Sequence, residues 1–115
     1  MSATISTAIE PLIERRIFDT EEEAIRVILQ AYILQQIGNL RRQMDRFEQK
    51  YGMRFQQFAE YLHERSVLLG NSDLSTEQRR ALNQVVMQEE DDWLDWKAAQ
   101  EMLGSWLGIR QEVTA

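Results

Sequence analysis

Near its end the chain carries a cluster of acidic and aromatic side chains that could do chemistry. In residues 87–103, which read MQEEDDWLDWKAAQEML, five carboxylates lie close to two tryptophans: Glu89, Glu90, Asp91, Asp92 and Asp95 beside Trp93 and Trp96. Clustered carboxylates can bind a metal ion, act in acid–base catalysis, or form an acidic face for another protein. The rest of the chain has to distinguish these three interpretations.

Metal binding and acid–base catalysis both lack the further residues that they need. No D-x-D-x-D-G calcium loop is present, and two carboxylates one helical turn apart, such as Asp91 and Asp95, bind magnesium weakly without a phosphate. Acid–base catalysis on glycosides requires carboxylates that face each other across a cleft, which neighbours on one helix do not do. We therefore expect no metal and no cofactor at this cluster.

The chain has one histidine, His63, which lies three residues after Glu60. Helical di-iron sites use this spacing, but they need two such pairs, and EYLHER is typical of an ordinary amphipathic helix. The chain has no cysteine and its five glycines are isolated, which excludes thiolate sites and phosphate-binding glycine loops. A single histidine also leaves no base for a serine in a nucleophile elbow. We predict that the protein is not an enzyme.

Composition favours a small protein without a membrane span. A chain of 115 residues with 43% hydrophobic side chains predicts one domain, or a small domain with an extension, whose limited core favours dimerisation. The N-terminus has no secretory signal pattern, and no apolar run approaches the ~18 residues of a transmembrane helix, so we expect a cytoplasmic protein. Residues 1–70 hold 10 acidic and 9 basic side chains, whereas residues 71–115 hold 9 and 4. This acidic second part would attract a basic partner.

Helix-forming residues dominate, and the fold class that we predict is all-α with about four helices. We expect a short helix at about 8–17, a long one from about 21 to 50 that stops at Gly52, a third at 54–69, and a fourth from 76 to about 107. Residues 2–6 alternate as a very short strand would. Capping boxes are predicted at Thr7–Glu10, Thr20–Glu23 and Ser75–Gln78, although Pro11 could instead open the first helix. We divide the chain into residues 1–51, 52–70 and 75–115.

The long helix carries two patterns, each with two interpretations. An apolar seam of near-heptad spacing either pairs with a second copy of the chain or packs against the chain's own helices: Ile25, Ile33, Ile37, Leu40, Met44 and Phe47. A basic strip either contacts nucleic acid or is a solvated face with offsetting acidic neighbours: Arg41, Arg42 and Arg46.

Residues 9–33, IEPLIERRIFDTEEEAIRVILQAYI, resemble the corresponding part of ribbon-helix-helix antitoxins and repressors. Leu12, Ile13, Ile17 and Phe18 match that family's first helix and turn, and Thr20 with Glu23–Arg26 matches its cap and EAIR segment, while Arg16 stands where the family usually has glycine. The resemblance implies a homodimer that pairs two N-terminal strands. It also implies operator binding through those strands, and a C-terminal extension that wraps a toxin.

These patterns lead to one favoured function and two alternatives. We expect an antitoxin-like, non-enzymatic protein whose C-terminal helix covers a small basic toxin through the acidic cluster, both of its tryptophans, Leu103 and Trp106. The tryptophans could instead be core residues. The alternative functions are a dimeric helical adaptor of an assembly, and a weak DNA-binding transcriptional regulator.

Overall fold

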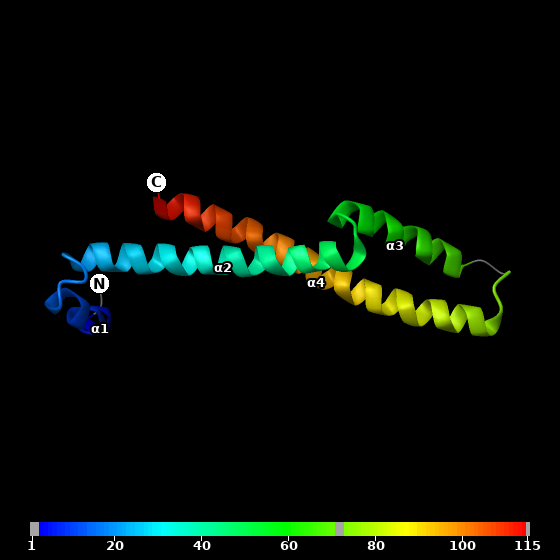
Figure 1. Ribbon diagram of the computed structural model, residues 1–115, viewed down its shortest axis with the longest axis horizontal. Coiled ribbons are helices and arrows are strands. Elements are labelled where there is room, and N and C mark those ends of the chain that lie inside the picture. Colours follow the sequence, from blue (N-terminus) through cyan, green and yellow to red (C-terminus); the bar gives the residue numbers. More distant parts are fainter. Residues whose placement is uncertain (1–2, 71–72, 115) are drawn as a thin grey trace. The chain divides into compact units, whose positions relative to one another are not determined.

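The computed structural model describes residues 3–70 and 73–114, which fold into four helices (Figure 1). These are α1 (Ala3–Glu14), α2 (Glu21–Tyr51), α3 (Phe55–Leu69) and α4 (Thr76–Thr114). The described residues contain no strand. The all-α prediction with a long second helix is therefore confirmed. None of these helices combines the length and the apolar character that are needed to cross a membrane.

Both ends of the chain are more helical than the sequence predicted. Residues 3–6, whose alternation suggested a very short strand, belong to α1, while Ser2 lies outside the described residues. Thr7 does not cap the helix, because its hydroxyl lies inside α1 and donates to the Ala3 carbonyl at 2.7 Å. Pro11 also lies inside α1 and not at its first position. At the other end α4 continues through Gly104 to Thr114, well beyond the predicted end near residue 107.

The predicted stops and starts between the helices are confirmed where side chains or glycine enforce them. The Glu23 amide donates to the Thr20 hydroxyl at 3.1 Å, which satisfies a free N–H at the start of α2. At α4 the Ser75 hydroxyl and the Gln78 side chain form the reciprocal capping box, with distances of 3.1 and 3.0 Å. After α2, Gly52 has φ of +63°, a left-handed conformation that glycine adopts without strain.

Arg16 ends α1 in a conformation that usually belongs to glycine. Its φ is +57°, and it is the one non-glycine residue with positive φ in the described part of the chain. The Arg16 amide donates to the Ile13 carbonyl and the Ile17 amide donates to the Leu12 carbonyl, both at 3.0 Å. This hydrogen-bond pair is a Schellman motif, which accounts for the left-handed residue. The family resemblance places a glycine at this position, although membership of that family stays a prediction.

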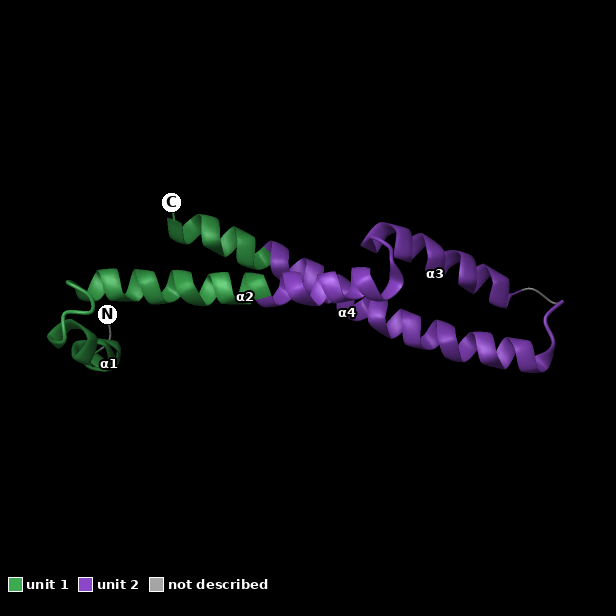
Figure 2. Cartoon of the chain, viewed as in Figure 1, with its two compact units in different colours: residues 1–38, 105–115 green, residues 39–104 purple. Residues whose placement is uncertain are grey.

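The chain forms two compact units whose boundaries fall inside helices (Figure 2). Unit 1 consists of residues 1–38 and 105–115, and unit 2 of residues 39–104. The units therefore differ from the sequential division at residues 51 and 70, because α2 and α4 each supply residues to both. In unit 1 the buried side chains are Ile9, Ala24, Ile33 and Ile37. In unit 2 the core forms around Phe58, Leu62 and Trp96.

Candidate protein-binding face

Helical periodicity divides the acidic cluster of α4 between two faces. Residues one or two turns apart share a face, so positions 89, 92, 93 and 96 lie on one side and positions 87, 90, 91, 94 and 95 on the other. On the first side Glu89 and Trp96 are buried and Asp92 and Trp93 are half-buried. On the second side all five residues are exposed. Only part of the predicted partner-binding set is therefore on the surface.

Trp96 is a core residue of unit 2. Its side chain is 0% exposed, and its ring centroid lies 5.5 Å from that of Phe47 and 5.6 Å from those of Phe55 and Phe58. Trp93, on the same side of α4, stacks on Phe55 with centroids 6.1 Å apart. Of the two orientations that the sequence left open for the tryptophans, the inward one is correct for Trp96. Its inclusion among the partner-binding residues was wrong.

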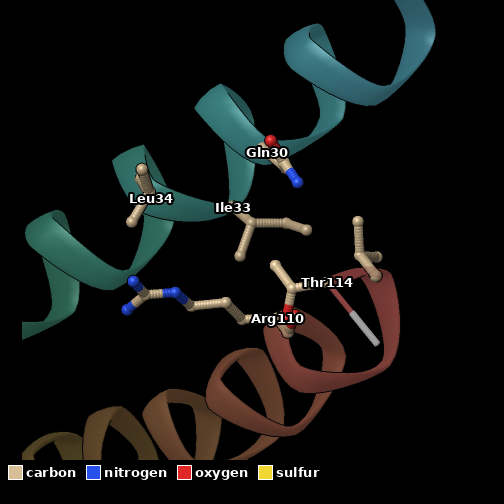
Figure 3. Close-up of a pocket in the computed structure, with 6 residues that line it drawn as sticks. Gln30, Ile33, Leu34, Arg110 and Thr114 are labelled. Carbon is tan, nitrogen blue, oxygen red and sulfur yellow. Dashed lines mark hydrogen bonds between the residues drawn. The ribbon is translucent and has the colours of Figure 1, made fainter. Parts of the chain in front are cut away.

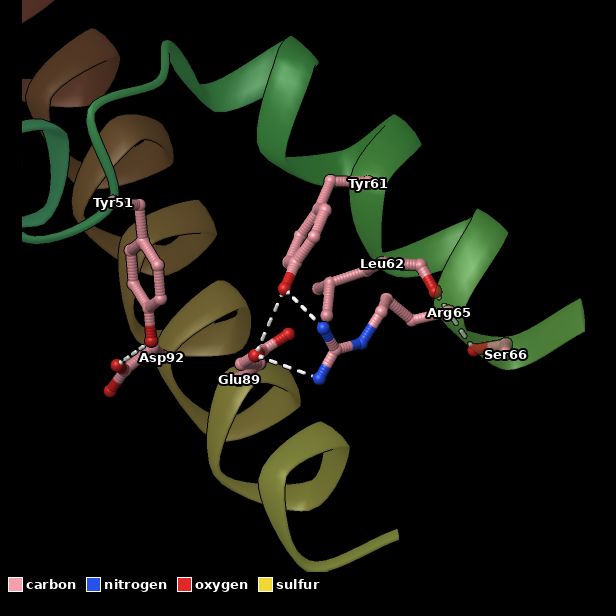
Figure 4. A network of polar contacts seen from close by, with 7 residues as sticks. All are labelled: Tyr51, Tyr61, Leu62, Arg65, Ser66, Glu89 and Asp92. Carbon is pink, nitrogen blue, oxygen red and sulfur yellow. Dashed lines mark hydrogen bonds and ion pairs between the residues drawn. The ribbon is translucent and has the colours of Figure 1, made fainter. Parts of the chain in front are cut away.

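Asp92 joins α4 to the end of α2 inside unit 2. Its carboxylate accepts a hydrogen bond from the Tyr51 hydroxyl (Figure 4). The Lys50 ammonium donates a second hydrogen bond to it at 2.6 Å. Burial alone would raise the pKa of Asp92, but the two hydrogen bonds and the positive charge of Lys50 lower it below its ordinary value. Burial, and then the hydrogen bond to Asp92, raise the pKa of Tyr51 well above its usual range. Asp92 is thus an intramolecular anchor whose Oδ2 accepts both hydrogen bonds.

Glu89 joins α4 to α3 in the same way. The Tyr61 hydroxyl donates to Glu89 Oε1 at 3.3 Å, and Arg65 lies 3.5 Å from the same oxygen while also donating to the Tyr61 hydroxyl at 2.7 Å (Figure 4). Glu89 is 8% exposed, so its placement on a partner-facing surface is also corrected. Its Oε2 is buried without a hydrogen-bond partner in the described residues, as are the indole nitrogens of Trp93 and Trp96. Packing, more than hydrogen bonding, therefore positions the two indoles.

The outward side of α4 in unit 2 combines carboxylates with apolar side chains that the sequence analysis did not single out. Glu90, Asp91 and Asp95 are exposed, as expected of partner-binding residues. Beside them Met87 is 57% exposed and Leu94 is 55% exposed. Met87 and Leu94 are seven residues apart and lie on a different side of α4 from the tryptophans. This spacing is the sequence signal that could have revealed the apolar pair.

A shallow groove lies between α3 and this part of α4. From α3 it is lined by Ala59, Leu62, His63 and Ser66, and from α4 by Glu90, Trp93 and Leu94. Of the Glu60–His63 pair, the histidine thus lies in the wall of an apolar groove. No group of three or more histidine, aspartate and glutamate side chains within residues 3–70 and 73–114 is arranged to hold a metal ion.

The apolar seam of α2 is taken up by the chain's own packing. Ile33, Ile37 and Leu40 are 1%, 2% and 8% exposed, and Met44 and Phe47 pack against the unit 2 core. Ile25 is half-buried. Ile33, Ile37 and Leu40 are therefore buried within a single chain, whereas dimerisation through α2 stays a prediction. The basic side chains of Arg41, Arg42 and Arg46 are exposed, and Arg42 donates a hydrogen bond to Asn39.

Leu103 and Trp106, the last members of the predicted partner-binding set, are half-buried. In unit 1 the ring of Trp106 packs edge-on against Tyr32, with centroids 5.8 Å apart. Nearby, α2 and the end of α4 line a small pocket with Gln30, Ile33, Leu34, Arg110, Val113 and Thr114 (Figure 3). Trp106 therefore has an intramolecular role in unit 1.

Comparison with known proteins identifies no relative of this chain. No protein-family model, no curated protein and no solved structure matches the chain.

Proposed function

We propose that the chain is a non-enzymatic binding protein that covers a basic surface of another protein with the outward side of α4. In its most concrete form it is antitoxin-like and neutralises a small basic toxin. The observation that carries the proposal is the group of exposed carboxylates Glu90, Asp91 and Asp95 on that side, next to exposed Leu94. Carboxylates at an interface steer a basic partner and select it, and exposed apolar side chains add buried area.

The internal pairing of the other carboxylates supports this use of the outer ones. Asp92 and Glu89 are held by Lys50 and Arg65, so the inner side of α4 is anchored within unit 2. A partner can therefore meet the outer side without an opening of the core. Less rearrangement on binding leaves more of the contact free energy for affinity.

A rescue assay tests the proposal. Each reading frame adjacent to the gene is expressed alone and together with this chain, and we expect one that encodes a basic protein, toxic alone and harmless in co-expression. The double variant Asp91→Lys/Asp95→Lys should abolish rescue. The control Glu10→Lys/Glu14→Lys alters net charge equally on the exposed side of α1 and should rescue as the parent chain does.

Two results would count against the proposal. If no neighbouring frame is toxic, the antitoxin form is lost and the adaptor alternative takes its place. If both double variants lose rescue alike, the rescue depends on the net charge of the chain and not on the outward side of α4.

A further inference from the structure

We propose that the groove between α3 and α4 receives an amphipathic helix of the basic partner. The apolar side chains of that helix would lie in the groove, and its lysines or arginines would meet the carboxylates that flank it. The inference rests on the proposed function and adds to it the structural element by which the partner binds. Amphipathic helices bind such grooves through apolar anchors spaced three or four residues apart.

Small side chains on α3 create the groove. Ala59 and Ser66 are seven residues apart, which places them on one side of α3 two turns from each other. Both line the groove, whereas buried Leu62 and half-buried Trp93 supply its apolar surface. A larger residue at either small position would fill the space between the two helices. The small side chains therefore leave a groove that side chains of a third helix can enter.

Exposed apolar side chains continue the groove surface along both helices. Leu94, at 55% exposure, lines the groove from α4, and Met87, at 57%, lies two turns before it on the same side. On α3, Val67 is 64% exposed and lies one turn after the groove residue His63. Grouped exposed apolar side chains of this kind mark interaction sites. The 15 residues of α3 extend for about 22 Å at 1.5 Å per residue, which would accommodate roughly four turns of a partner helix.

The charges beside the groove determine which helix fits. Glu90 lines it, Asp91 is exposed next to Glu90, and Glu60 is exposed on α3 beside Ala59. Lys97 lies three residues after Leu94 on α4, and its ammonium is 5.2 Å from the centre of the Trp93 ring. A second copy of this chain would bring two acidic rims together, which is unfavourable. A basic helix has the complementary charge.

Two synthetic peptides of identical composition test the proposal. Each has 15 residues of leucine, lysine and alanine, one with leucines at i, i+3, i+4 and i+7, the other with the same residues scattered around the helix. Fluorescence anisotropy of the labelled peptides is measured against the full chain. We expect the amphipathic peptide to bind at least about tenfold more tightly than its scrambled isomer, because only its leucines can enter the groove together.

A matched pair of variants locates the binding site. Leu94→Arg places a charged side chain at the groove and should weaken binding of the amphipathic peptide by at least about tenfold. Val85→Arg is the control, because Val85 is 44% exposed and lies nine residues before Leu94, on the opposite side of α4. Both variants add one positive charge, so an equal effect of the two would overturn the groove as the site.

The remaining outcomes separate this inference from the proposed function. Equal binding of both peptides, weakened by Asp91→Lys/Asp95→Lys but not by Leu94→Arg, would overturn the groove inference and leave charge-based covering in place. Failure of both peptides to bind would also overturn the groove inference, whereas the rescue assay would still judge the proposed function by itself.

Discussion

Replacement of Trp96 by alanine should remove the largest side chain of the unit 2 core. Trp96 is fully buried and has three aromatic neighbours, Phe47, Phe55 and Phe58, with ring centroids within 5.6 Å. Truncation of a buried tryptophan costs about 3–5 kcal/mol, from lost transfer free energy and from the cavity that remains. A chain of 115 residues is stabilised by roughly 6–17 kcal/mol in total, so this loss is a large fraction of its free energy of unfolding.

Urea denaturation followed by far-UV circular dichroism measures this effect. With a denaturant slope of about 2 kcal/mol per molar, the midpoint should fall by roughly 2 M. Leu94→Ala is the matched control, because it lies two residues away on α4 but is 55% exposed. Its expected change in stability is within about 0.5 kcal/mol.

The comparison of the two variants can refute the burial argument. If Trp96→Ala shifts the midpoint no more than Leu94→Ala does, Trp96 does not lie in a packed core. The interpretation of the tryptophans as partner-binding residues would then be restored. A loss confined to Trp96→Ala supports the division of α4 into an inner and an outer side.

Three further predictions concern polar and backbone features. Because the folded-state pKa of Asp92 is lowered, its stabilising contribution is complete above the unfolded-state pKa near 3.9 and is lost as the pH falls through the folded-state pKa. Asp92→Asn should lower the free energy of unfolding by about 1–2 kcal/mol at pH 7. The difference between the urea midpoints at pH 7 and pH 2 should therefore be smaller in the variant than in the parent chain. Glu89→Leu should lower the free energy of unfolding by about 2 kcal/mol, because Arg65 loses its partner. In a double-mutant cycle, Arg65→Met in the same chain should recover part of that loss, and additive losses would contradict the pairing. Arg16→Gly should raise the free energy of unfolding by up to about 1 kcal/mol, since glycine adopts positive φ without strain, and a lower urea midpoint would refute the Schellman geometry.

The local structure was largely predictable because short-range chemistry determines it. The reciprocal hydrogen bonds of Ser75 with Gln78 start α4, and the left-handed conformation of Gly52 ends α2, so both boundaries followed from neighbouring residues. The predicted end of α4 was wrong, because Gly104 costs a helix only about 1 kcal/mol and the following residues join unit 1. A start at Thr7 was wrong for a similar reason, since a threonine hydroxyl can also bond to a carbonyl within a helix.

The sequence by itself determined that the chain is helical, where α2 and α3 begin and end, and where α4 begins. It also determined that an acidic, tryptophan-bearing stretch lies on α4. Only the tertiary structure decided which carboxylates are available. Glu89 and Asp92 point inward because Arg65, Tyr61, Lys50 and Tyr51 are there to meet them, and those partners lie 24 to 42 residues away along the chain. The helical period separates the two sides of α4, but it does not say which side the packing of α2 and α3 will cover. That choice leaves Glu90, Asp91 and Asp95 exposed, with Glu90 in the wall of the groove.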